Sequence, residues 1–462
     1  MLNFSAHSLD NHLHGEKVRR ILQLAMEAAD PRRCLPRFVR RDGNLLIVDG
    51  RSYALDDFSQ LYVLSVGKAA EAMADSLLPL LDDRLSGGLI ITKHASRAIV
   101  GRLAVMDAGH PLPDARSLVA GQRVLNLLSH LRPDDLLICL ISGGASALMT
   151  APVDGISLDD LRNLTSLLLA DGASIDELNA VRKQLDQLKG GGLARRSSAN
   201  VVSLILSDVV GDRLDLIASG PTVPESTSTE DIERIVTRYK LASRLPSHVL
   251  TVLTQISPKI GVQTLVCDDQ RAKARTPEIF ERTNKPEASS FDHVQNVIVG
   301  SNRLAARAAM DAAKRKGFHA RILTTTMQGE ARVQGVQLAM TLRRARTRPL
   351  CLIAGGETTV TVTGNGLGGR NQELALAAAQ ELDGLRDVML LSFATDGDDG
   401  PTGAAGAVVT GETLLRSHEL GLDDQDFLLR NDSHTFFNAL NDLLIPGLTG
   451  TNVNDLVLLF KF

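Results

Sequence analysis

The chain has 462 residues, of which 44% are hydrophobic and 23% are charged, a composition typical of a soluble globular protein. This length exceeds what one hydrophobic core usually organises, which predicts two domains. The formal net charge of -4 disfavours a general nucleic-acid or membrane-surface binder, and an aromatic content of 3% without Trp disfavours a base-stacking surface.

The cysteines and the N-terminal region further limit the classes of protein to which the chain can belong. The four cysteines form no C-x-x-C pair, which disfavours a zinc site or a disulfide framework. The first residues include Asp10 and Glu16 and lack the apolar run of a secretory signal, and no apolar segment is long enough to span a bilayer. We therefore expect a cytoplasmic protein with no nucleic-acid or membrane partner.

Strands that alternate with helices run through the first half of the chain. Apolar runs predict strands at 44–48, 61–66, 88–92, 104–107, 136–141 and 201–206. Asp114 is expected to cap a helix that reaches His130, and capping boxes at Ser157 and Ser174 predict the starts of two more. This alternation predicts an α/β fold with a doubly wound parallel sheet in the N-terminal domain.

The alternation stops at residues 257–290, which contain mixed charges and three prolines. We interpret this stretch as a linker or insertion. The predicted organisation is therefore an N-terminal domain at 1–250, a linker or insertion at 251–292, and a second, smaller α/β domain at 293–462. In the latter, strands are expected at 297–299, 319–323 and 388–393, with helices at 301–316 and 328–344.

A glycine-rich stretch at 352–373 is the most distinctive feature of the second half. Its Thr/Val alternation at 358–363 predicts a strand, and Gly364, Gly366 and Gly369 then fit G-x-G-x-x-G before a predicted helix that starts near Arg370. Such glycines let backbone N–H groups approach an anion at a helix N-terminus. The pattern indicates a phosphate site, although a lone G-x-G-x-x-G is common by chance and also permits a dinucleotide.

Polar side chains gather where the predicted strands end, which is the edge at which α/β sheets bind ligands. Phosphoryl transfer needs positive charge, a divalent metal held by carboxylates, and an oriented hydroxyl. The residues that could supply these parts are Lys68, Ser142, Ser146, Asn179, Lys183, Asp208, Glu357, Arg370, Thr395, Asp396 and Asp398. Each also has a structural interpretation, because helix charges are commonly solvated and aspartates suit turns.

The chain resembles the glycerate 2-kinase family, the class II glycerate kinases with a MOFRL-type C-terminal domain, over nearly its whole length. The resemblance rests on ordered motifs: SVGKA at 65–69, AGHPLPD at 108–114, ISGGASAL at 141–148, NAVRK at 179–183, KGG at 189–191, LSDVVGD at 206–212, ASGPT at 218–222, GGETTV at 355–360, GLGGRNQE at 366–373, ATDG at 394–397, DGPT at 399–402 and GTNVND at 450–455.

The resemblance implies that ATP and Mg²⁺ are used to phosphorylate D-glycerate at its 2-hydroxyl, giving 2-phosphoglycerate and ADP. It also implies a large Rossmann-like N-terminal domain, a smaller α/β domain and a cleft between them, in a monomer or homodimer whose partners are small molecules. Because family members have been labelled hydroxypyruvate reductases, an NAD(P)H-dependent reductase is the alternative.

Lys68, Arg370, Asp208 and Asp396 are the predicted catalytic residues, and the two aspartates are also the candidate Mg²⁺ ligands. Whether Arg370 binds an ATP phosphate or the glycerate carboxylate stays open. The residues predicted to contact the nucleotide are Ser142, Gly143, Gly144, Ser146, Asn179, Lys183, Gly220, Glu357, Gly366, Gly368, Gly369, Thr395, Asn452 and Asn454.

Overall fold

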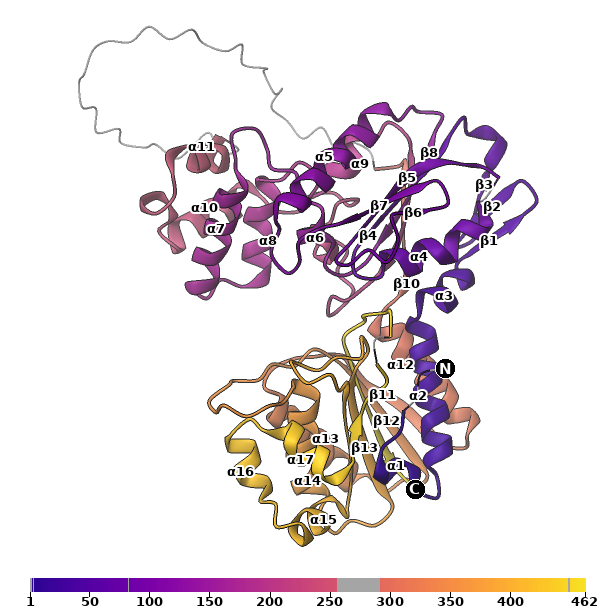
Figure 1. The fold of residues 1–462 in the computed structure, drawn as a ribbon, viewed down its shortest axis with the longest axis vertical. Coiled ribbons are helices and arrows are strands. Elements are labelled where there is room, and N and C mark those ends of the chain that lie inside the picture. Colours follow the sequence, from indigo (N-terminus) through magenta and orange to yellow (C-terminus); the bar gives the residue numbers. More distant parts are fainter. Residues whose placement is uncertain (1, 3, 82, 256–290, 448) are drawn as a thin grey trace, which may run out of the picture.

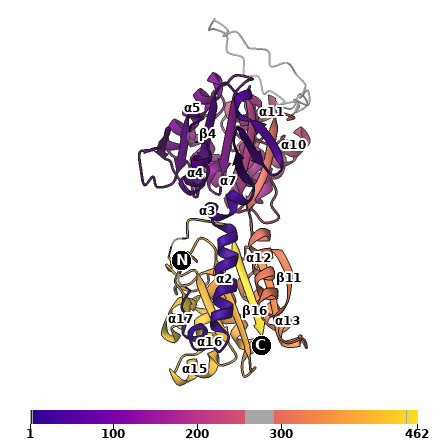
Figure 2. The same cartoon turned by 90° about the vertical axis from the view of Figure 1, so that its right-hand side faces the viewer.

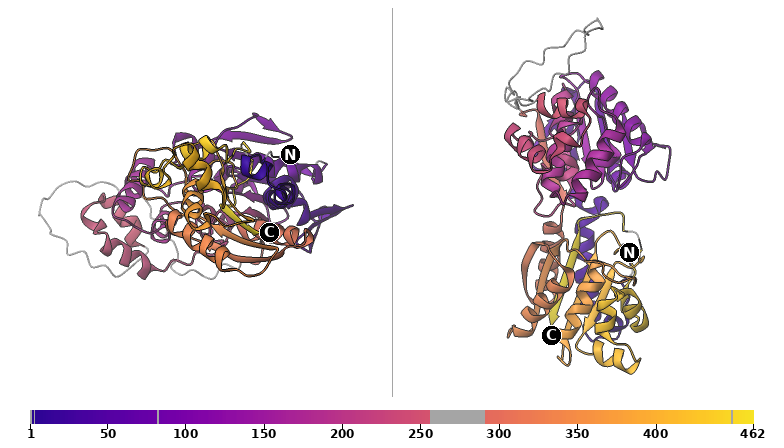
Figure 3. Two further views of the ribbon diagram at one scale, coloured as in Figure 1. Left: turned by 90° about the horizontal axis from the view of Figure 1, so that it is seen from below. Right: turned by 90° about the vertical axis from the view of Figure 1, so that its left-hand side faces the viewer.

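Two α/β domains are stacked end to end in the computed structural model, which describes residues 2, 4–81, 83–255, 291–447 and 449–462 (Figure 1). The domains lie one above the other in the side views as well (Figures 2 and 3). Both chain ends belong to the second domain, because the N-terminal helices pack there beside the last strand (Figure 2).

Buried apolar runs form the seven-stranded sheet of the first domain, in the order β10-β9-β8-β4-β5-β7-β6. All neighbours in this sheet are parallel except β6 and β7, which confirms the predicted doubly wound parallel sheet. Its strands are β4 (Leu61–Val66), β5 (Leu85–Thr92), β6 (Ile99–Val100), β7 (Leu103–Asp107), β8 (Leu136–Ile141), β9 (Asn200–Leu206) and β10 (Val294–Gly300). Every residue of β8 is buried, as expected of a strand covered on both faces.

Helices cover the first sheet and extend to one side of it (Figure 1). They are α3 (Pro31–Cys34), α4 (Ala70–Leu77), α5 (Ala115–His130), α6 (Ala145–Leu148), α7 (Leu158–Ala170), α8 (Ile175–Gln184), α9 (Gly192–Arg196), α10 (Thr229–Arg238) and α11 (Ser247–Gln255). Asp114, Ser157 and Ser174 cap α5, α7 and α8 as predicted, each accepting a hydrogen bond from the third residue of its helix. Helices α7, α8, α10 and α11 enclose a small core of their own.

The second domain is built on a six-stranded mixed sheet in the order β11-β12-β16-β13-β14-β15. Its strands are β11 (His319–Met327), β12 (Leu350–Gly356), β13 (Val388–Ala394), β14 (Gly406–Thr410), β15 (Leu443–Leu444) and β16 (Asp455–Lys461). One face packs against α2 (Gly15–Ala29) and α12 (Asn302–Arg315). The other face packs against α13 (Ala331–Arg344), α14 (Arg370–Leu382) and α17 (Ser433–Leu440), while α1 (His7–Asp10), α15 (Thr413–Glu419) and α16 (Asp424–Leu429) lie at the periphery.

The last strand of the chain, β16, occupies the centre of this second sheet. It is antiparallel to both β12 and β13, so Asp455 at its start pairs with Gly356 at the end of β12 and with Ala394 at the end of β13. The loops that leave β12 and β13 therefore meet around Asp455. No sequence pattern predicted β16, the element that brings these loops together.

At two places an element packs in the domain on the other side of a predicted domain limit. Strand β10 follows residue 293 but belongs to the first sheet, and α2 belongs to the N-terminal region but packs on α12 in the second domain. Ser8 also bonds to Asp442, and Thr451 to the carbonyl of Ala29. The limits themselves stay predictions. Most of the predicted linker lies outside the described residues, apart from 251–255 in α11 and 291–292 before β10.

The strand predicted at 358–363 is wrong. Only Thr359 makes a bridge, to Glu330, and most side chains of the segment are exposed, so its Thr/Val alternation has no sheet face to cover. The strand predicted at 44–48 is β2 (Leu45–Val48), which lies between β1 (Val39–Asp42) and β3 (Arg51–Ala54) in a small antiparallel sheet. Within the described part of the chain, the helices fall short of the length and hydropathy needed to cross a membrane.

A buried carboxylate fixes the N-terminal segment to the second domain. Asp442 is fully buried and accepts hydrogen bonds from the Ser8 amide (2.7 Å), the Ser8 hydroxyl (2.8 Å) and Arg416 (2.7 Å). We expect Asp442→Ala to lower the free energy of unfolding by about 3 kcal/mol, because Arg416 is left without its counter-charge. Urea unfolding measures this change. Asp426→Ala, which removes an exposed pair with Arg430, should cost less than about 1 kcal/mol; equal losses would contradict the assignment.

Candidate active site

Three loops of the first domain converge because β9, β8 and β4 are neighbours in the sheet and all end at the same edge. Lys68 follows β4, and its amide donates to the carbonyl of Gly143 at 2.9 Å. The Ser142 hydroxyl accepts from the amide of Ala69 at 3.1 Å. A Cβ at Gly143 would overlap the carboxylate of Asp208, so only glycine lets the loops after β8 and β9 approach this closely.

Gly144 continues this turn in the left-handed conformation, with φ of 86°. A Cβ there would lie 2.8 Å from His110 Cδ2 and 3.5 Å from Lys68 Cγ, so both side chains border the glycine. Burial, Lys68 and Lys93 together lower the pKa of His110 to about 4. His110 is therefore neutral near pH 7, and Lys68 supplies the positive charge at the turn.

The carboxyl of Asp208 is tuned toward neutral pH. Burial raises its pKa to about 6, with a further contribution from the negative charge of Glu357, and the nearby Lys68 acts in the opposite direction. The pKa of Asp208 therefore responds to one cation of the first domain, Lys68, and to one carboxylate of the second domain, Glu357. Perturbed carboxyls of this kind are concentrated at functional sites.

A cavity of about 580 Å³ separates the two domains at this point. The first domain contributes Gly144, Ser146, Asn179, Arg182, Asp208 and Ser219 to its walls, and the second contributes Thr326, Gln328 and Glu357. The ends of the first sheet thus face the loop that leaves β12. The cleft implied by the resemblance corresponds to this cavity.

Arg370 contacts both a residue that lines the cavity, Glu357, and a buried residue of the second domain, Asp455. Its Nε and Nη2 donate to the two carboxylate oxygens of Asp455 at 2.6 and 3.0 Å, and its Nη1 lies 3.0 Å from Glu357 Oε1. Burial raises the pKa of Asp455 to about 7, while the bidentate contact with Arg370 acts against that rise. The guanidinium is therefore held in one orientation at the first residue of α14.

The glycine-rich stretch has a packing explanation that the sequence analysis lacked. Cβ atoms at Gly364 and Gly366 would overlap the backbone of Arg430, and one at Gly369 would overlap Asp399. The Asp399 carboxylate also accepts from the amides of Asn371 and Gln372 at about 3 Å, so it already occupies the N-terminus of α14. With the preceding strand also absent, the dinucleotide interpretation of this stretch is wrong.

The contribution of Gly366, Gly368 and Gly369 to nucleotide binding stays a prediction. Of these, Gly366 is exposed and Gly368 and Gly369 are half-buried beside Arg370. The Cβ of an alanine at Gly368 would contact Ser433. Packing and ligand binding would both require glycine here.

Of the other predicted residues in the first domain, Ser146 and Asn179 line the cavity, whereas Lys183 and Gly220 do not. The Ser146 and Ser219 hydroxyls are 2.9 Å apart, and Ser219 in turn donates to Asn179 at 3.4 Å. Lys183, one turn after Asn179 on α8, is buried and lies 3.5 Å from Glu225. Gly220 adopts the left-handed conformation with φ of 62°, directly after Ser219.

The remaining predicted residues surround the start of β16. The buried Thr395 hydroxyl donates to the carbonyl of Asn454 at 2.7 Å, and the Asn454 amide donates to Asn452 at 3.1 Å. Asp396 accepts from the amide of Asp398 at 3.2 Å. Within the described part of the chain, no cavity wall, hydrogen bond or ion pair joins Asp396 to Asp208, and no group of three acidic, His or Cys side chains is arranged as a metal site.

Three residues of this region were not singled out from the sequence, namely Arg182, Asp399 and Asp455, and a fourth, His110, was predicted to be structural. Each lies inside a motif that carries the family resemblance, and motif position was the only available signal. Their roles depend on contacts with residues at least 17 positions away, such as that between Arg182 and Thr165. The spacing within a motif does not encode such contacts.

Two family models match the chain: the domain of unknown function DUF4147 over residues 17–254 and the MOFRL family over residues 350–455. Among curated relatives, glycerate 2-kinase of Pyrococcus horikoshii is 37% identical over 95% of each chain. D-glycerate 2-kinase of Thermotoga maritima is 39% identical over 87% of this chain and 91% of that one. Glycerate kinase of Homo sapiens is 38% identical over 96% and 92%.

Solved structures agree with these relatives. A crystal structure of glycerate kinase from Thermotoga maritima has a TM-score of 0.81 at 36% identity, covering 97% of this chain and 99% of that one. The fold and the site define a two-domain α/β protein whose charged residues surround a cavity between the domains. The chain belongs to the glycerate 2-kinase family.

Because its pKa is raised, Asp208 should destabilise the folded protein at neutral pH. The folded state holds this proton up to about pH 6, whereas the unfolded chain releases it near pH 4, so stability falls as the pH rises through this window. We expect Asp208→Asn to raise the free energy of unfolding by about 1–3 kcal/mol at pH 7. Urea unfolding should show the gain shrinking toward pH 4, and Asp159→Asn at an exposed carboxylate should show none. A pH-independent difference would contradict the raised pKa.

Proposed function

We propose that this protein transfers the γ-phosphoryl group of ATP to the 2-hydroxyl of D-glycerate, forming 2-phosphoglycerate and ADP. The observation that carries the proposal is the similarity, over nearly the whole chain, to proteins named glycerate 2-kinase and D-glycerate 2-kinase. The geometry supports it, because Asp208 lines the inter-domain cavity. Lys68 and Arg370 lie beside two further lining residues, Gly144 and Glu357.

Lys68 and Arg370 act on the transferring phosphoryl group in this proposal. Its transition state spreads negative charge over the phosphoryl oxygens, so fixed cations supply much of the catalysis. The Lys68 backbone is held by the hydrogen bond from its amide to Gly143, and the Arg370 guanidinium is held by two hydrogen bonds to Asp455. The guanidinium of Arg370 therefore does not have to reorganise when charge develops.

Asp208 accepts the proton of the attacking hydroxyl. A carboxyl whose pKa is about 6 is mostly ionised at pH 7 yet more basic than an ordinary aspartate. It also lines the cavity beside Gly144 and Ser146, whose turn supplies backbone amides for the phosphates of the nucleotide. The nucleotide-binding roles of Asn179, Lys183, Gly220, Thr395, Asn452 and Asn454 remain part of the proposal.

Mg²⁺ is a further component of the proposal, and the side chains at the cavity fit it. Mg²⁺ is usually held by one or two carboxylates together with substrate phosphates. Asp208 and Glu357 both line the cavity, and the charge of Glu357 acts on Asp208, so two carboxylates face the same space. When bound, the metal neutralises charge on the nucleotide phosphates. Asp396 stays a predicted ligand without contact support.

The alternative activity, NAD(P)H-dependent reduction of hydroxypyruvate, has no support among these relatives, which are named as kinases. The stretch that suggested a dinucleotide lacks its strand, and Asp399 occupies the helix N-terminus where a pyrophosphate would bind. Nothing in the described geometry favours this second function.

The purified protein should release ADP when supplied with D-glycerate, ATP and Mg²⁺, because Asp208 and Glu357 face one inter-domain cavity and the proposed cations lie beside residues that line it. A coupled assay measures ADP, and NMR of the product identifies which hydroxyl carries the phosphate. Hydroxypyruvate with NADH is the matched control and should show no loss of NADH. NADH consumption without ADP release, or a phosphate on the 3-hydroxyl, would contradict the proposal.

Lys68→Ala and Arg370→Ala should each lower kcat by about 10²–10³-fold, the effect typical of removing one group that stabilises transition-state charge. Steady-state kinetics measures the loss, and circular dichroism checks that both variants remain folded. The exposed Lys316 provides a control, because Lys316→Ala removes a cation of the second domain that lies at the end of α12. Turnover like that of the wild type in either active-site variant would remove that residue from the mechanism.

A further inference from the structure

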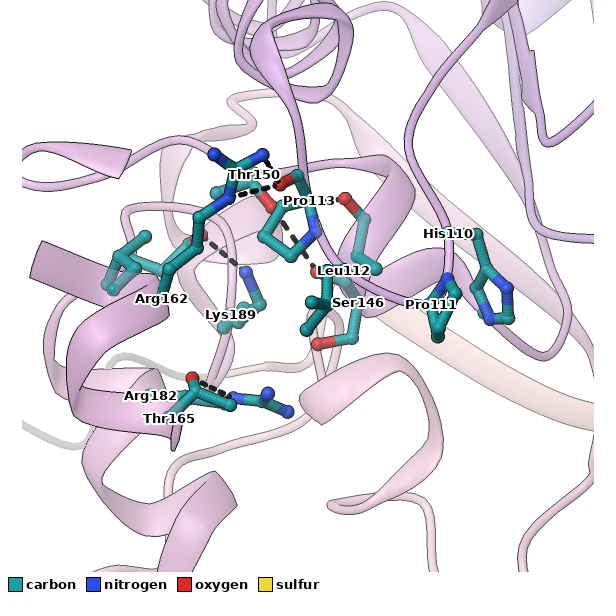
Figure 4. Close-up of a pocket in the computed structure, with 14 residues that line it drawn as sticks. His110, Pro111, Leu112, Pro113, Ser146, Thr150, Arg162, Thr165, Arg182 and Lys189 are labelled. Carbon is teal, nitrogen blue, oxygen red and sulfur yellow. Dashed lines mark hydrogen bonds and ion pairs between the residues drawn. The ribbon is translucent and has the colours of Figure 1, made fainter. Parts of the chain in front are cut away.

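A second, smaller cavity of about 160 Å³ lies within the first domain, between the loop that contains His110 and the helices α7 and α8 (Figure 4). It shares Gly144, Ser146 and Arg182 with the inter-domain cavity, so the two spaces adjoin along the turn after β8. Its volume is below the roughly 300 Å³ at which pockets for drug-sized ligands begin. It suits a small ligand and is too small for a nucleotide.

Three cations line this small cavity, and two of them already have partners. Lys189 forms a buried ion pair with Asp186. Arg162 donates from Nε and Nη2 to the carbonyl of Pro113 at 3.0 and 2.7 Å, an arrangement visible in Figure 4. The charges of both side chains are therefore satisfied by groups of the protein.

Arg182 is different. Its Nε donates to the Thr165 hydroxyl at 3.2 Å, and among the described residues no carboxylate lies within ion-pair distance of its guanidinium. Its Nη1 and Nη2 make no hydrogen bond to any residue in the described ranges. Burial lowers the pKa of Arg182, with no neighbouring carboxylate to oppose the effect.

A partly buried guanidinium without a counter-charge is costly unless a ligand supplies one. The planar fork of arginine matches a carboxylate or a phosphate with two parallel hydrogen bonds. Arg182 therefore has two Nη groups available for an anion and one fixed contact, to Thr165, that orients the fork. The anion must fit a small space, which favours one carried by a three-carbon acid over one carried by a nucleotide.

We propose that Arg182 binds the carboxylate of the acceptor acid, so that D-glycerate occupies the small cavity and ATP the larger one. This inference rests on the proposed function. Arg182 lines both cavities and Asp208 lines the larger one, so an acid held at Arg182 lies next to the space that Asp208 faces. Arg370, on the opposite domain, is then left to the phosphates of the nucleotide.

Kinetics with each substrate varied in turn test the assignment. We expect Arg182→Gln to raise KM for D-glycerate about 100-fold, as for removal of one partner from a buried charge pair, while KM for ATP changes less than about threefold. Arg182→Lys, which keeps the charge but loses the fork, should raise KM for D-glycerate about tenfold. Thr165→Val should give a smaller rise, because the guanidinium loses its orienting contact. The exposed Arg234 supplies the control, Arg234→Gln, which should match the wild type.

Binding without turnover provides an independent measurement. D-glycerate should raise the melting temperature of the wild type and of Arg234→Gln, but not that of Arg182→Gln, whereas a non-hydrolysable ATP analogue should raise all three. A rise in KM for ATP with an unchanged KM for D-glycerate would assign the anion to the nucleotide and overturn the inference. Unchanged values for both substrates would also overturn it.

Failure of the proposed function would look different. In that case the wild type itself would release no ADP with D-glycerate, whatever the state of Arg182. The melting measurements would still decide the inference, because loss of the D-glycerate shift in Arg182→Gln supports the site and its persistence refutes it. Circular dichroism of Arg182→Lys guards against a variant that simply fails to fold.

Discussion

The ion pair between Arg370 and Asp455 depends on the placement of β16, and the second half of the site depends on that pair. Because β16 runs antiparallel between β12 and β13, its first residue lies where both neighbours end. Asp455 can therefore hold a guanidinium that comes from a different loop, at the start of α14. A buried bidentate contact requires the desolvation of both charges. It also holds Arg370 in a fixed orientation beside Glu357.

In the first domain, close contacts between backbone segments bring the charged residues together. Parallel neighbours β4, β8 and β9 end together, and Gly143 and Gly144 let Lys68, His110 and Asp208 crowd around one turn. Burial leaves His110 neutral and raises the pKa of Asp208, so this edge combines one cation, one neutral ring and one basic carboxylate. Two cavities of unequal size adjoin along this turn, and the proposal assigns the smaller one to the acid and the larger one to the nucleotide.

Prediction from sequence was reliable where local signals decide structure. The fully apolar run of β8, the capping serines of α7 and α8, and the alternation of strands and helices all correspond to observed elements. It was wrong at 358–363, where alternation without a neighbouring strand produced no sheet. The ligand role of Gly364, Gly366 and Gly369 stays a prediction, and each of these glycines also approaches backbone or carboxylate atoms of residues 399–432.

The sequence by itself determined the α/β class, the strand-end positions of Lys68 and Asp208, the helix-start position of Arg370, and the family, because these depend on periodicity and motif order. Only the tertiary structure decided which charges are satisfied. Lys189 is paired with Asp186, three residues before it, whereas Arg182 on α8 has no carboxylate within ion-pair distance among the described residues. Asp455 meets Arg370 across 85 positions of chain. Such pairings follow from strand order and burial, which no local pattern of residue types specifies.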